Sequence, residues 1–190
     1  GTHFNARVSA YTGVFNLNGG EFDLPVTLQD TGYTNSTGSG NCVFDDSLTI
    51  IHDGDNWLKM ANTNGDTYNG PVSIVNHSIN PVYLSISDTS YFNDNLEIAS
   101  TNFGGFIFGN SNGVSYLANG KTITIGPEGF INNYLILQYF KQLGSTAQTM
   151  TLTDTATVRL VSCEFNGGLT LEAPAITLKN SIFYGTTELT

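Results

Sequence analysis

A seven-residue pattern that recurs nine times constrains the fold of this chain more than any other feature. Each copy reads aromatic, Asn or Asp, two variable residues, aliphatic, then Thr, Ser or Glu, and a second aliphatic residue, with small variations. The copies that keep the aromatic begin at Phe4, Phe22, Phe44, Tyr68, Phe92, Phe165 and Phe183. Two weaker copies lack it, NGKTITI from Asn119 and TAQTMTL from Thr146. These starts follow one another at short and nearly regular intervals, so we treat the chain as a tandem array.

Apolar and polar residues alternate inside the copies, as in LTI at 48–50 and LEI at 96–98, so we predict that each copy is one β-strand with alternate side chains directed inward. A second apolar run follows most copies after a polar gap. These runs lie at 14–17, 57–60, 82–86, 106–108, 135–137, 158–160 and 176–178. Two or three short strands per unit, joined by Gly, Asn, Asp and Ser turns, make one coil of a solenoid. We therefore predict an all-β fold, a right-handed parallel β-helix of about nine coils.

Stacked coils place equivalent side chains above one another, about 4.8 Å apart. We expect the seven aromatic residues to form a column, and the residues that follow them to form an amide ladder at a turn. The ladder would contain Asn5, Asn69, Asn93 and Asn166, with Asp23 and Asp45 as substitutes. Both columns are interpreted as packing and turn structure rather than as ligand sites.

A sandwich of two antiparallel sheets is the alternative fold, because it also has short strands at regular spacing. Hairpin-linked strands have no reason to share a sequence, so the repeated pattern favours the solenoid. A long polar stretch at 31–40 is expected to be a turn.

Charge and composition narrow the function. Six Lys and Arg against sixteen Asp and Glu give a net charge of −10, which repels a phosphate backbone and argues against a nucleic-acid partner. The chain has no apolar run of about 18 residues and no signal-like start, so we expect no membrane insertion by this segment. Scarce Lys and abundant Asn and Thr suit an extracellular or cell-surface location.

A larger period joins the two ends of the sequence. The segment 1–28 matches the segment 162–189 at a constant offset, which aligns Phe4 with Phe165 and Phe22 with Phe183. We therefore interpret the range 1–190 as a single solenoid segment of a longer repeat array. In this array a superrepeat of about 161 residues restarts near position 162.

Several longer stretches resemble a known group of proteins. WLKMANTNGDTYNGPVSI, NGKTITIGPEGF, FKQLGSTAQTMTLT and FNGGLTLEAPAITLKNSIFYGTTELT are similar to repeats of very large cell-surface proteins of Bacteroidota, of the kind associated with type IX secretion, adhesion and gliding. The resemblance is strongest over 57–74 and 121–190, and residues 19–41 depart from it. It implies an exported stalk or fibre, and it carries no catalytic residues to transfer.

An enzymatic site is the alternative to this structural interpretation. Parallel β-helices also occur in polysaccharide-degrading enzymes, whose sites need clustered carboxylates. The candidates are Asp45, Asp46, Asp53, Asp55, Asp66, Asp88 and Asp94. All fall in expected turns, where Asp satisfies local backbone groups. We predict no enzyme activity, no catalytic residues and no metal or cofactor site.

Three weaker hints remain. Residues 53–56 (DGDN) have a slight likeness to a calcium loop but lack the spacing of one. His52 and His77 are expected to be neighbours in adjacent coils, which is a weak hint of a metal site. The Thr-x-Thr runs at 122–124 and 149–157 suggest an ice-binding face, a minor alternative because the central coils supply only one Thr or Ser each.

Cys42 and Cys163 each precede their aromatic residue by two positions, five coils apart. At about 4.8 Å per coil this separates them by roughly 24 Å, so we predict no disulfide between them.

We therefore expect a stiff stalk or fibre segment that supports adhesion or gliding. Its expected partners are neighbouring repeats of the same chain and further copies in a fibre. The alternative is a solenoid whose flank binds surface glycans through Trp57, Tyr83 or Tyr134, ranked second because Trp57 and Tyr83 lie in strand-like runs where core packing is commoner.

Overall fold

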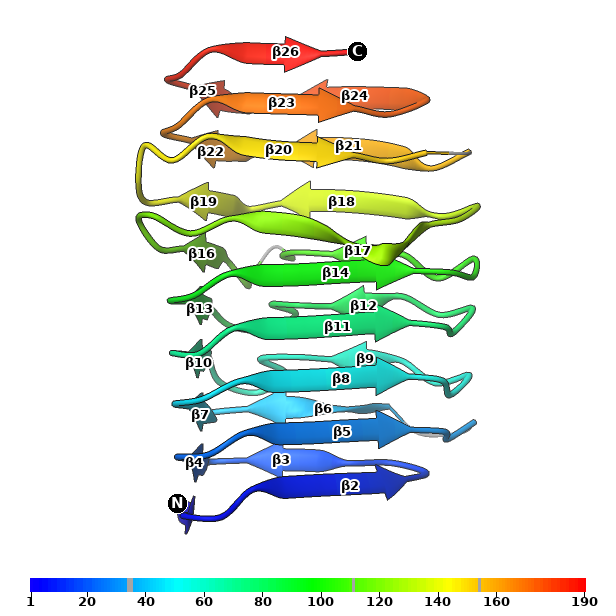
Figure 1. Ribbon diagram of the computed structural model, residues 1–190, viewed down its shortest axis with the longest axis vertical. Coiled ribbons are helices and arrows are strands. Elements are labelled where there is room, and N and C mark those ends of the chain that lie inside the picture. Colours follow the sequence, from blue (N-terminus) through cyan, green and yellow to red (C-terminus); the bar gives the residue numbers. More distant parts are fainter. Residues whose placement is uncertain (34–35, 111, 154) are drawn as a thin grey trace.

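The computed structural model describes residues 1–33, 36–110, 112–153 and 155–190. Within these ranges the chain is all-β without a helix, and every pairing between named strands is parallel. Strands in front run from left to right as the chain climbs from the N-terminus, and the chain returns behind, so the coil is right-handed (Figure 1). The predicted fold class, a right-handed parallel β-solenoid, is confirmed.

Each coil contributes one strand to each of three faces. Sheet A has nine strands: β1 (Thr2–Phe4), β4 (Gly20–Phe22), β7 (Val43–Phe44), β10 (Asp66–Tyr68), β13 (Ser90–Phe92), β16 (Ser115–Leu117), β19 (Phe140–Gln142), β22 (Glu164–Phe165) and β25 (Ile182–Phe183). Sheet B has six: β2 (Val8–Thr12), β5 (Val26–Asp30), β8 (Leu48–His52), β11 (Val72–Asn76), β14 (Leu96–Ser100) and β17 (Ile123–Phe130).

The third face is sheet C, with eight strands: β3 (Asn16–Asn18), β6 (Thr37–Gly40), β9 (Leu58–Lys59), β12 (Val82–Tyr83), β15 (Phe106–Ile107), β18 (Tyr134–Gln138), β21 (Thr157–Val161) and β24 (Ala175–Lys179). Sheet D continues the face of sheet B above a break, with β20 (Gln148–Thr151), β23 (Leu169–Glu172) and β26 (Thr187–Leu189) (Figure 1). The described strands make eight complete coils and a ninth of two strands, slightly fewer than the nine expected.

The seven-residue pattern spans a corner, which corrects the expectation that each copy is one strand. The aromatic residue ends a strand of sheet A, and the aliphatic pair belongs to the next strand of sheet B. In the third coil, for example, Phe44 ends β7 and Leu48 begins β8. The turn between them holds the Asn or Asp and the variable residues.

The predicted second strands lie in sheet C, which also contains a strand that the sequence did not reveal. β6 forms from TGSG inside the stretch that was expected to be a polar turn. A Cβ atom built on Gly38 would lie 1.8 Å from the carbonyl oxygen of Lys59, so glycine permits this close approach of backbones. Thr34 and Asn35, in the same stretch, lie outside the described residues.

Two copies of the pattern needed correction in register. Leu117 and Gln142 occupy the place of the aromatic residue, because Phe92 pairs with Leu117 and Leu117 with Gln142. In the later copy Gln148, and not Met150, lies opposite Leu169. A shift of two residues keeps every side chain on its face, so alternation alone could not distinguish these registers.

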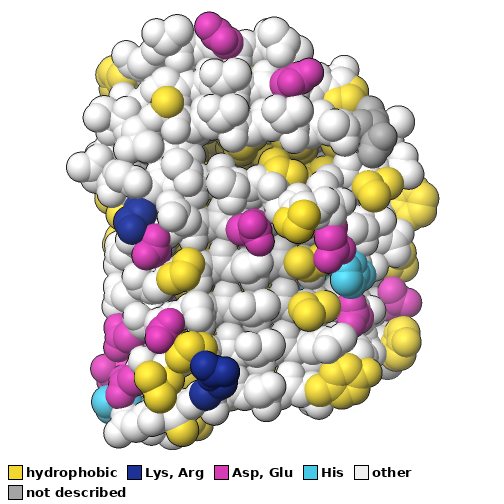
Figure 2. Space-filling view, in the orientation of Figure 1, with side chains coloured by type: hydrophobic (Ala, Val, Ile, Leu, Met, Phe, Trp, Pro, Cys, Tyr) yellow, Lys and Arg dark blue, Asp and Glu magenta, His cyan; other side chains and the backbone are white. Residues whose placement is uncertain are grey.

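The face of sheet B is interrupted after β17. The pairing of β14 with β17 shifts register between Ile98 and Ser100, where β17 contains extra residues around Gly126–Gly129. β17 bends toward β14 at this end, and β17 and β20 belong to different sheets (Figure 1). A recess with hydrophobic side chains at its base is visible between them (Figure 2).

Candidate functional site

Aromatic rings stack along one side of the solenoid at the ends of seven of the nine sheet A strands. Ring centroids are 4.7 Å apart for Phe4 and Phe22, 4.9 Å for Phe22 and Phe44, 5.4 Å for Phe44 and Tyr68, 4.8 Å for Tyr68 and Phe92, and 5.5 Å for Phe165 and Phe183. Their planes are within 10° of parallel. Leu117 and Gln142 separate the two stretches of this aromatic column. Such pairs stabilise a fold by about 0.5–1.5 kcal/mol each beyond burial.

An exposed amide ladder runs beside this column through three coils. The Asn93 side chain donates from Nδ2 to Oδ1 of Asn69 at 2.8 Å, and Asn69 donates to Oδ1 of Asp45 at 2.6 Å. Asn166 instead donates to the backbone oxygen of Gln142 at 2.7 Å. Asn5 and Asp23 hold the equivalent place in the first two coils, and Asp23 contacts His3 there. The ladder therefore connects fewer residues than the sequence pattern suggested.

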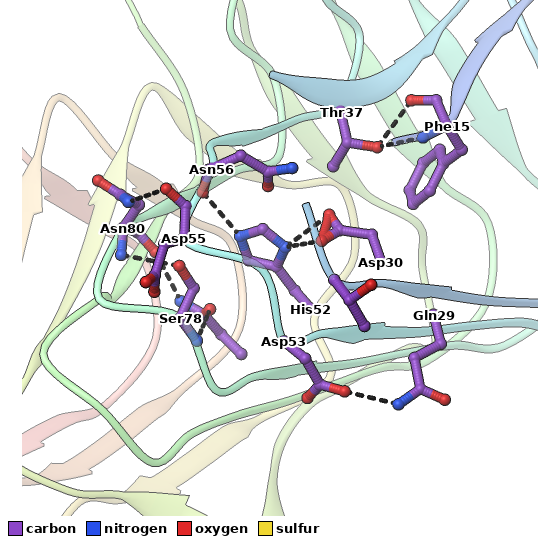
Figure 3. A network of polar contacts seen from close by, with 12 residues as sticks. Phe15, Gln29, Asp30, Thr37, His52, Asp53, Asp55, Asn56, Ser78 and Asn80 are labelled. Carbon is purple, nitrogen blue, oxygen red and sulfur yellow. Dashed lines mark hydrogen bonds and ion pairs between the residues drawn. The ribbon is translucent and has the colours of Figure 1, made fainter. Parts of the chain in front are cut away.

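A second, buried ladder occupies the corner between sheets B and C, and the sequence pattern missed it. Asp30, His52, Asn76 and Ser100 are register neighbours at the ends of successive strands, and all are fully buried. Three of them donate to the backbone oxygen four residues later: His52 to Asn56 at 3.1 Å, Asn76 to Asn80 at 3.1 Å, and Ser100 to Gly104. The ladder closes the same corner in four successive coils, and Figure 3 shows its first two members, Asp30 and His52.

The hydrogen bonds of His52 determine where its protons lie. Nε2 faces the carbonyl oxygen of Asn56, which can only accept, so Nε2 carries a proton. Nδ1 lies 2.9 Å from Oδ2 of Asp30, and one further proton is needed to join that nitrogen to a carboxylate oxygen. The pair therefore shares two protons inside the solenoid. Both side chains are inaccessible to a substrate.

Another buried polar group closes the corner between sheets C and A. Asp66 accepts hydrogen bonds from the Ser39 hydroxyl at 2.5 Å, from the backbone of Cys42 at 2.9 Å and Ala61 at 2.8 Å, and from the Tyr68 hydroxyl at 3.3 Å. Burial raises the pKa of this carboxyl despite these donors. The next two coils place Ser90 and Ser115 at the same register position.

The remaining carboxylates considered as catalytic candidates are dispersed. Asp46, Asp88 and Asp94 each accept from the next backbone N–H in their turns, at 2.6–2.7 Å, and Asp45 belongs to the amide ladder. Asp53 and Asp55 lie on the opposite corner. Acidic side chains on the visible surface gather near the N-terminal end of sheet A (Figure 2).

The expected histidine neighbours face opposite directions. His52 points inward, whereas His77 lies on the surface between Asp53 (Nδ1 to Oδ1, 2.6 Å) and Glu128 (Nε2 to Oε2, 2.8 Å). Asp53 also accepts from Gln29 at 2.6 Å (Figure 3). The oxygens of Asp53 in the possible calcium loop are thus both engaged by side chains.

Among the described residues, His3, Glu21 and Asp23 are the group whose ligand atoms lie within 4.8 Å of one another. His3 is hydrogen-bonded to Asp23 at 2.7 Å, and this contact raises the pKa of His3. These exposed groups satisfy one another, so the geometry alone does not define a metal site.

Outward hydroxyls on sheet B form one column rather than a broad ice-binding face. Register neighbours in this column are Ser9, Thr27, Thr49, Ser73, Glu97 and Thr124. Glu97 interrupts the hydroxyls and accepts from Ser73 at 3.1 Å.

Both cysteines are buried and free, and they directly precede β7 and β22, which lie five strands apart in sheet A. Burial raises the pKa of the Cys163 thiol to about 11, so it is protonated at neutral pH.

A surface groove lies at the corner between sheets B and C, and Trp57 forms part of its wall. Its volume is about 360 Å³, and it is lined by Tyr33, Ser36, Asp55, Asn56, Trp57, Lys59 and Asn80. Trp57 is 44% exposed, which contradicts the expectation that it packs in the core. Tyr83 and Tyr134 are half-buried, and the Tyr83 ring lies 6.0 Å from that of Trp57.

No family model, no curated protein and no solved structure matches this chain. The resemblance to Bacteroidota surface repeats therefore stays a prediction. The described residues contain no helix long and apolar enough to span a membrane.

Proposed function

We propose that this chain is a shaft segment of an extracellular repeat protein, a stalk or fibre that supports adhesion or gliding. The observation that carries the proposal is sheet A, which continues without interruption through all nine strands. A parallel ladder with stacked side chains in its interior resists bending, because bending would separate backbone hydrogen bonds and rings together.

The strand positions agree with the proposed superrepeat. β2 begins at Val8 and β23 at Leu169, while β5 begins at Val26 and β26 at Thr187, so both pairs of strands show the same offset in the sequence. The cell-surface setting rests on the sequence resemblance, and the shaft geometry is compatible with it.

A fusion of the segment 1–161 to a complete second copy tests the shaft. If coils continue across the junction, electron microscopy and small-angle scattering will show one rod, longer than the single segment by seven coils or about 34 Å. A control fusion with one extra residue inside β2 of the second copy reverses the faces of the rest of that strand and should bend or break the rod. Two separate beads in the in-register fusion would refute the proposal.

A further inference from the structure

The turn between β16 and β17 extends beyond the shaft. This corner holds five residues, 118–122, where the corner 93–95 of the preceding coil holds three. The longer turn projects further to the left in Figure 1 than the turn between β13 and β14. A backbone hydrogen bond from the N–H of Lys121 to the oxygen of Ala118, at 3.3 Å, closes it. An exposed turn closed by so long a bond is a place where the backbone can rotate locally.

Asn119 and Gly120 occupy the tip of this turn. Both are exposed, and Gly120 has a φ of +79° and open space where a Cβ atom would lie. Among the described residues, neither the Asn119 side chain nor the Gly120 N–H has a hydrogen-bond partner. The Asn119 side chain lies against the backbone of Gly144 in the next coil, without a hydrogen bond to it. No polar contact therefore holds either the side-chain amide or the backbone nitrogen that follows it.

An asparagine followed by glycine carries its own nucleophile. The nitrogen of Gly120, after losing its proton to a base in solution, can attack Cγ of Asn119 and close a five-membered succinimide ring. The bond between Cγ and Nδ2 breaks, and Nδ2 leaves as ammonia with one proton from water. Water then opens the ring at either carbonyl carbon. Opening at the side-chain carbonyl gives aspartate, and opening at the backbone carbonyl gives isoaspartate, in which the chain runs through Cγ.

Hydrogen bonds restrain most of the other Asn–Gly pairs of the sequence. In three of them the glycine N–H donates to an oxygen at 3.0–3.2 Å; these pairs begin at Asn18, Asn112 and Asn166. In a fourth, the amide of Asn69 is held at both ends, by Asp45 at 2.6 Å and by Asn93 at 2.8 Å. A bonded N–H keeps its proton, and a bonded amide cannot turn toward the backbone. These pairs can therefore react only after local opening of the structure.

The pair Asn64 and Gly65 is restrained by its backbone. The N–H of Gly65 has no hydrogen-bond partner among the described residues, but both flanking peptide groups are anchored. The oxygen of Asn64 accepts from the N–H of Asn41 at 3.2 Å, and the N–H of Asp66 donates to the oxygen of Thr89 at 3.1 Å. A Cβ atom on Gly65 would lie 2.4 Å from that oxygen. Rotation of this backbone toward the side chain would break these contacts, so we expect slower reaction here than at Asn119.

We propose that Asn119 is a site of spontaneous deamidation, where a succinimide forms with Gly120 and opens to isoaspartate or aspartate with water as the co-reactant. The modification adds a negative charge at the corner that leads into β17, and isoaspartate also adds one methylene to the backbone there. It therefore alters the interrupted coil and leaves the coils from β4 to β15 unchanged. The proposal does not depend on the shaft function.

Incubation of the 190-residue protein in mildly alkaline buffer, followed by peptide mapping with mass spectrometry, tests the proposal. Each event exchanges ammonia for water, so the change in mass locates it, and enzymatic methylation with a labelled donor detects isoaspartate. We expect Asn119 to react roughly tenfold or more faster than Asn69 and Asn166. The same incubation in urea is the control, because unfolding exposes every Asn–Gly pair and should bring their rates together.

Asn119→Gln separates this site from slow modification elsewhere. Glutamine keeps the amide but would have to close a larger ring, so the variant should lose the fast event and keep the slow ones. Asn64→Gln is the matched control, because Asn64 is also exposed and followed by glycine, and it should leave the fast event unchanged. Both variants should unfold at the temperature of the parent protein. A fast event that persists in Asn119→Gln, faster reaction of Asn64 than of Asn119, or equal rates in the folded and unfolded protein would overturn the proposal.

Discussion

The regular coils from β4 to β15 and the interrupted coil from β16 to β20 use the same faces but fill their corners differently. In the regular coils aromatic rings lie on aromatic rings, and Asp30, His52, Asn76 and Ser100 close the opposite corner. In the interrupted coil the corresponding positions hold Leu117, Gln142 and Phe130. Sheet B ends where its corner ladder ends, whereas sheet A continues through the substitution.

Gln148 replaces backbone ladder bonds across the break, and Gln142 bonds backbone groups of its own coil and of the following one. Gln148, fully buried, accepts from the backbone N–H of Ile123 at 2.8 Å and donates to the backbone oxygen of Lys121 at 3.0 Å. Gln142 accepts from the backbone N–H of Gly167 and donates to the oxygen of Thr146. The comparison shows that side-chain amides can form the hydrogen bonds that backbone groups lose at a break in a sheet. The other faces continue without a break and keep the coils in register.

The largest effect is expected in the aromatic column of the regular coils. Phe44 is fully buried between two rings, so Phe44→Ala should lower the free energy of unfolding by about 3–5 kcal/mol. Phe183→Ala is the control, because Phe183 stacks on one ring only and is partly exposed. Urea denaturation of both variants measures the difference, and an equal loss would show that stacking position is unimportant.

The second largest loss of stability is expected for the buried pair Asp30 and His52 at the corner between sheets B and C. Asp30→Leu leaves His52 without its carboxylate in an apolar corner, and we expect a loss of about 3 kcal/mol in urea denaturation. Replacing both residues by Leu should recover part of that loss, because no buried charge then remains unpaired. If the single variant is as stable as the double, the pair does not act as a unit.

The glutamine at the break should have a smaller effect. Gln148→Leu keeps the size of the side chain but leaves the N–H of Ile123 unpaired, at a cost of about 2 kcal/mol. Hydrogen exchange at the Ile123 amide should accelerate in this variant. Thr149→Ala, at an exposed position on the same strand, should change stability by less than about 0.5 kcal/mol. Unchanged protection of Ile123 would argue against the bridging role.

The surface cluster that connects the two regions should give the smallest effect, and one that depends on pH. Partial burial by itself lowers the pKa of His77, but hydrogen bonds to Glu128 and Asp53 outweigh it and raise the pKa. Burial likewise opposes the lowered pKa of Asp53, which results from its contacts with Gln29 and His77. Glu128 lies in the extra residues of β17, so the cluster ties the interrupted coil to a regular one.

The stabilisation from His77 is complete below its unfolded pKa and is lost as pH rises through its raised folded pKa. The contribution of Asp53 is present above its unfolded pKa and is lost as pH falls through its lowered folded pKa. The stabilising contributions of His77 and Asp53 are therefore both present between about pH 4 and 6.5. Because these groups are about one-third exposed or more, we expect about 0.5 kcal/mol or less. In thermal unfolding, His77→Gln should reduce the stability difference between pH 6 and pH 9, and a larger difference would contradict this assignment.

The features that the sequence predicted are those in which like residues repeat. Phenylalanine or tyrosine recurs at one position of the pattern, and alternation of Leu, Thr and Ile marks the strands of sheet B. The corner ladder escaped prediction because Asp30, His52, Asn76 and Ser100 have equivalent positions but no chemical type in common. β6 escaped because TGSG has turn composition, and only the close approach of Lys59 shows why glycine is needed there.

The candidate site was only partly predictable. Trp57 was singled out as an exposed aromatic residue under the glycan-binding alternative, but its position in a strand-like run favoured burial. Trp57 is exposed because it lies at the corner between sheets B and C. The unpaired amide of Asn56 depends on three-dimensional packing alone. Residue spacing cannot report either property.

The spacing of the central coils has a consequence for how such a molecule can change length. Phe44, Tyr68 and Phe92 follow one another at equal intervals in the sequence, and the strands between them pair position for position. Unequal recombination that duplicates or removes the codons of one such interval would return every strand to the register it left. The solenoid could then gain or lose whole coils through changes in the gene. Each added coil would keep the corner structure of its neighbours.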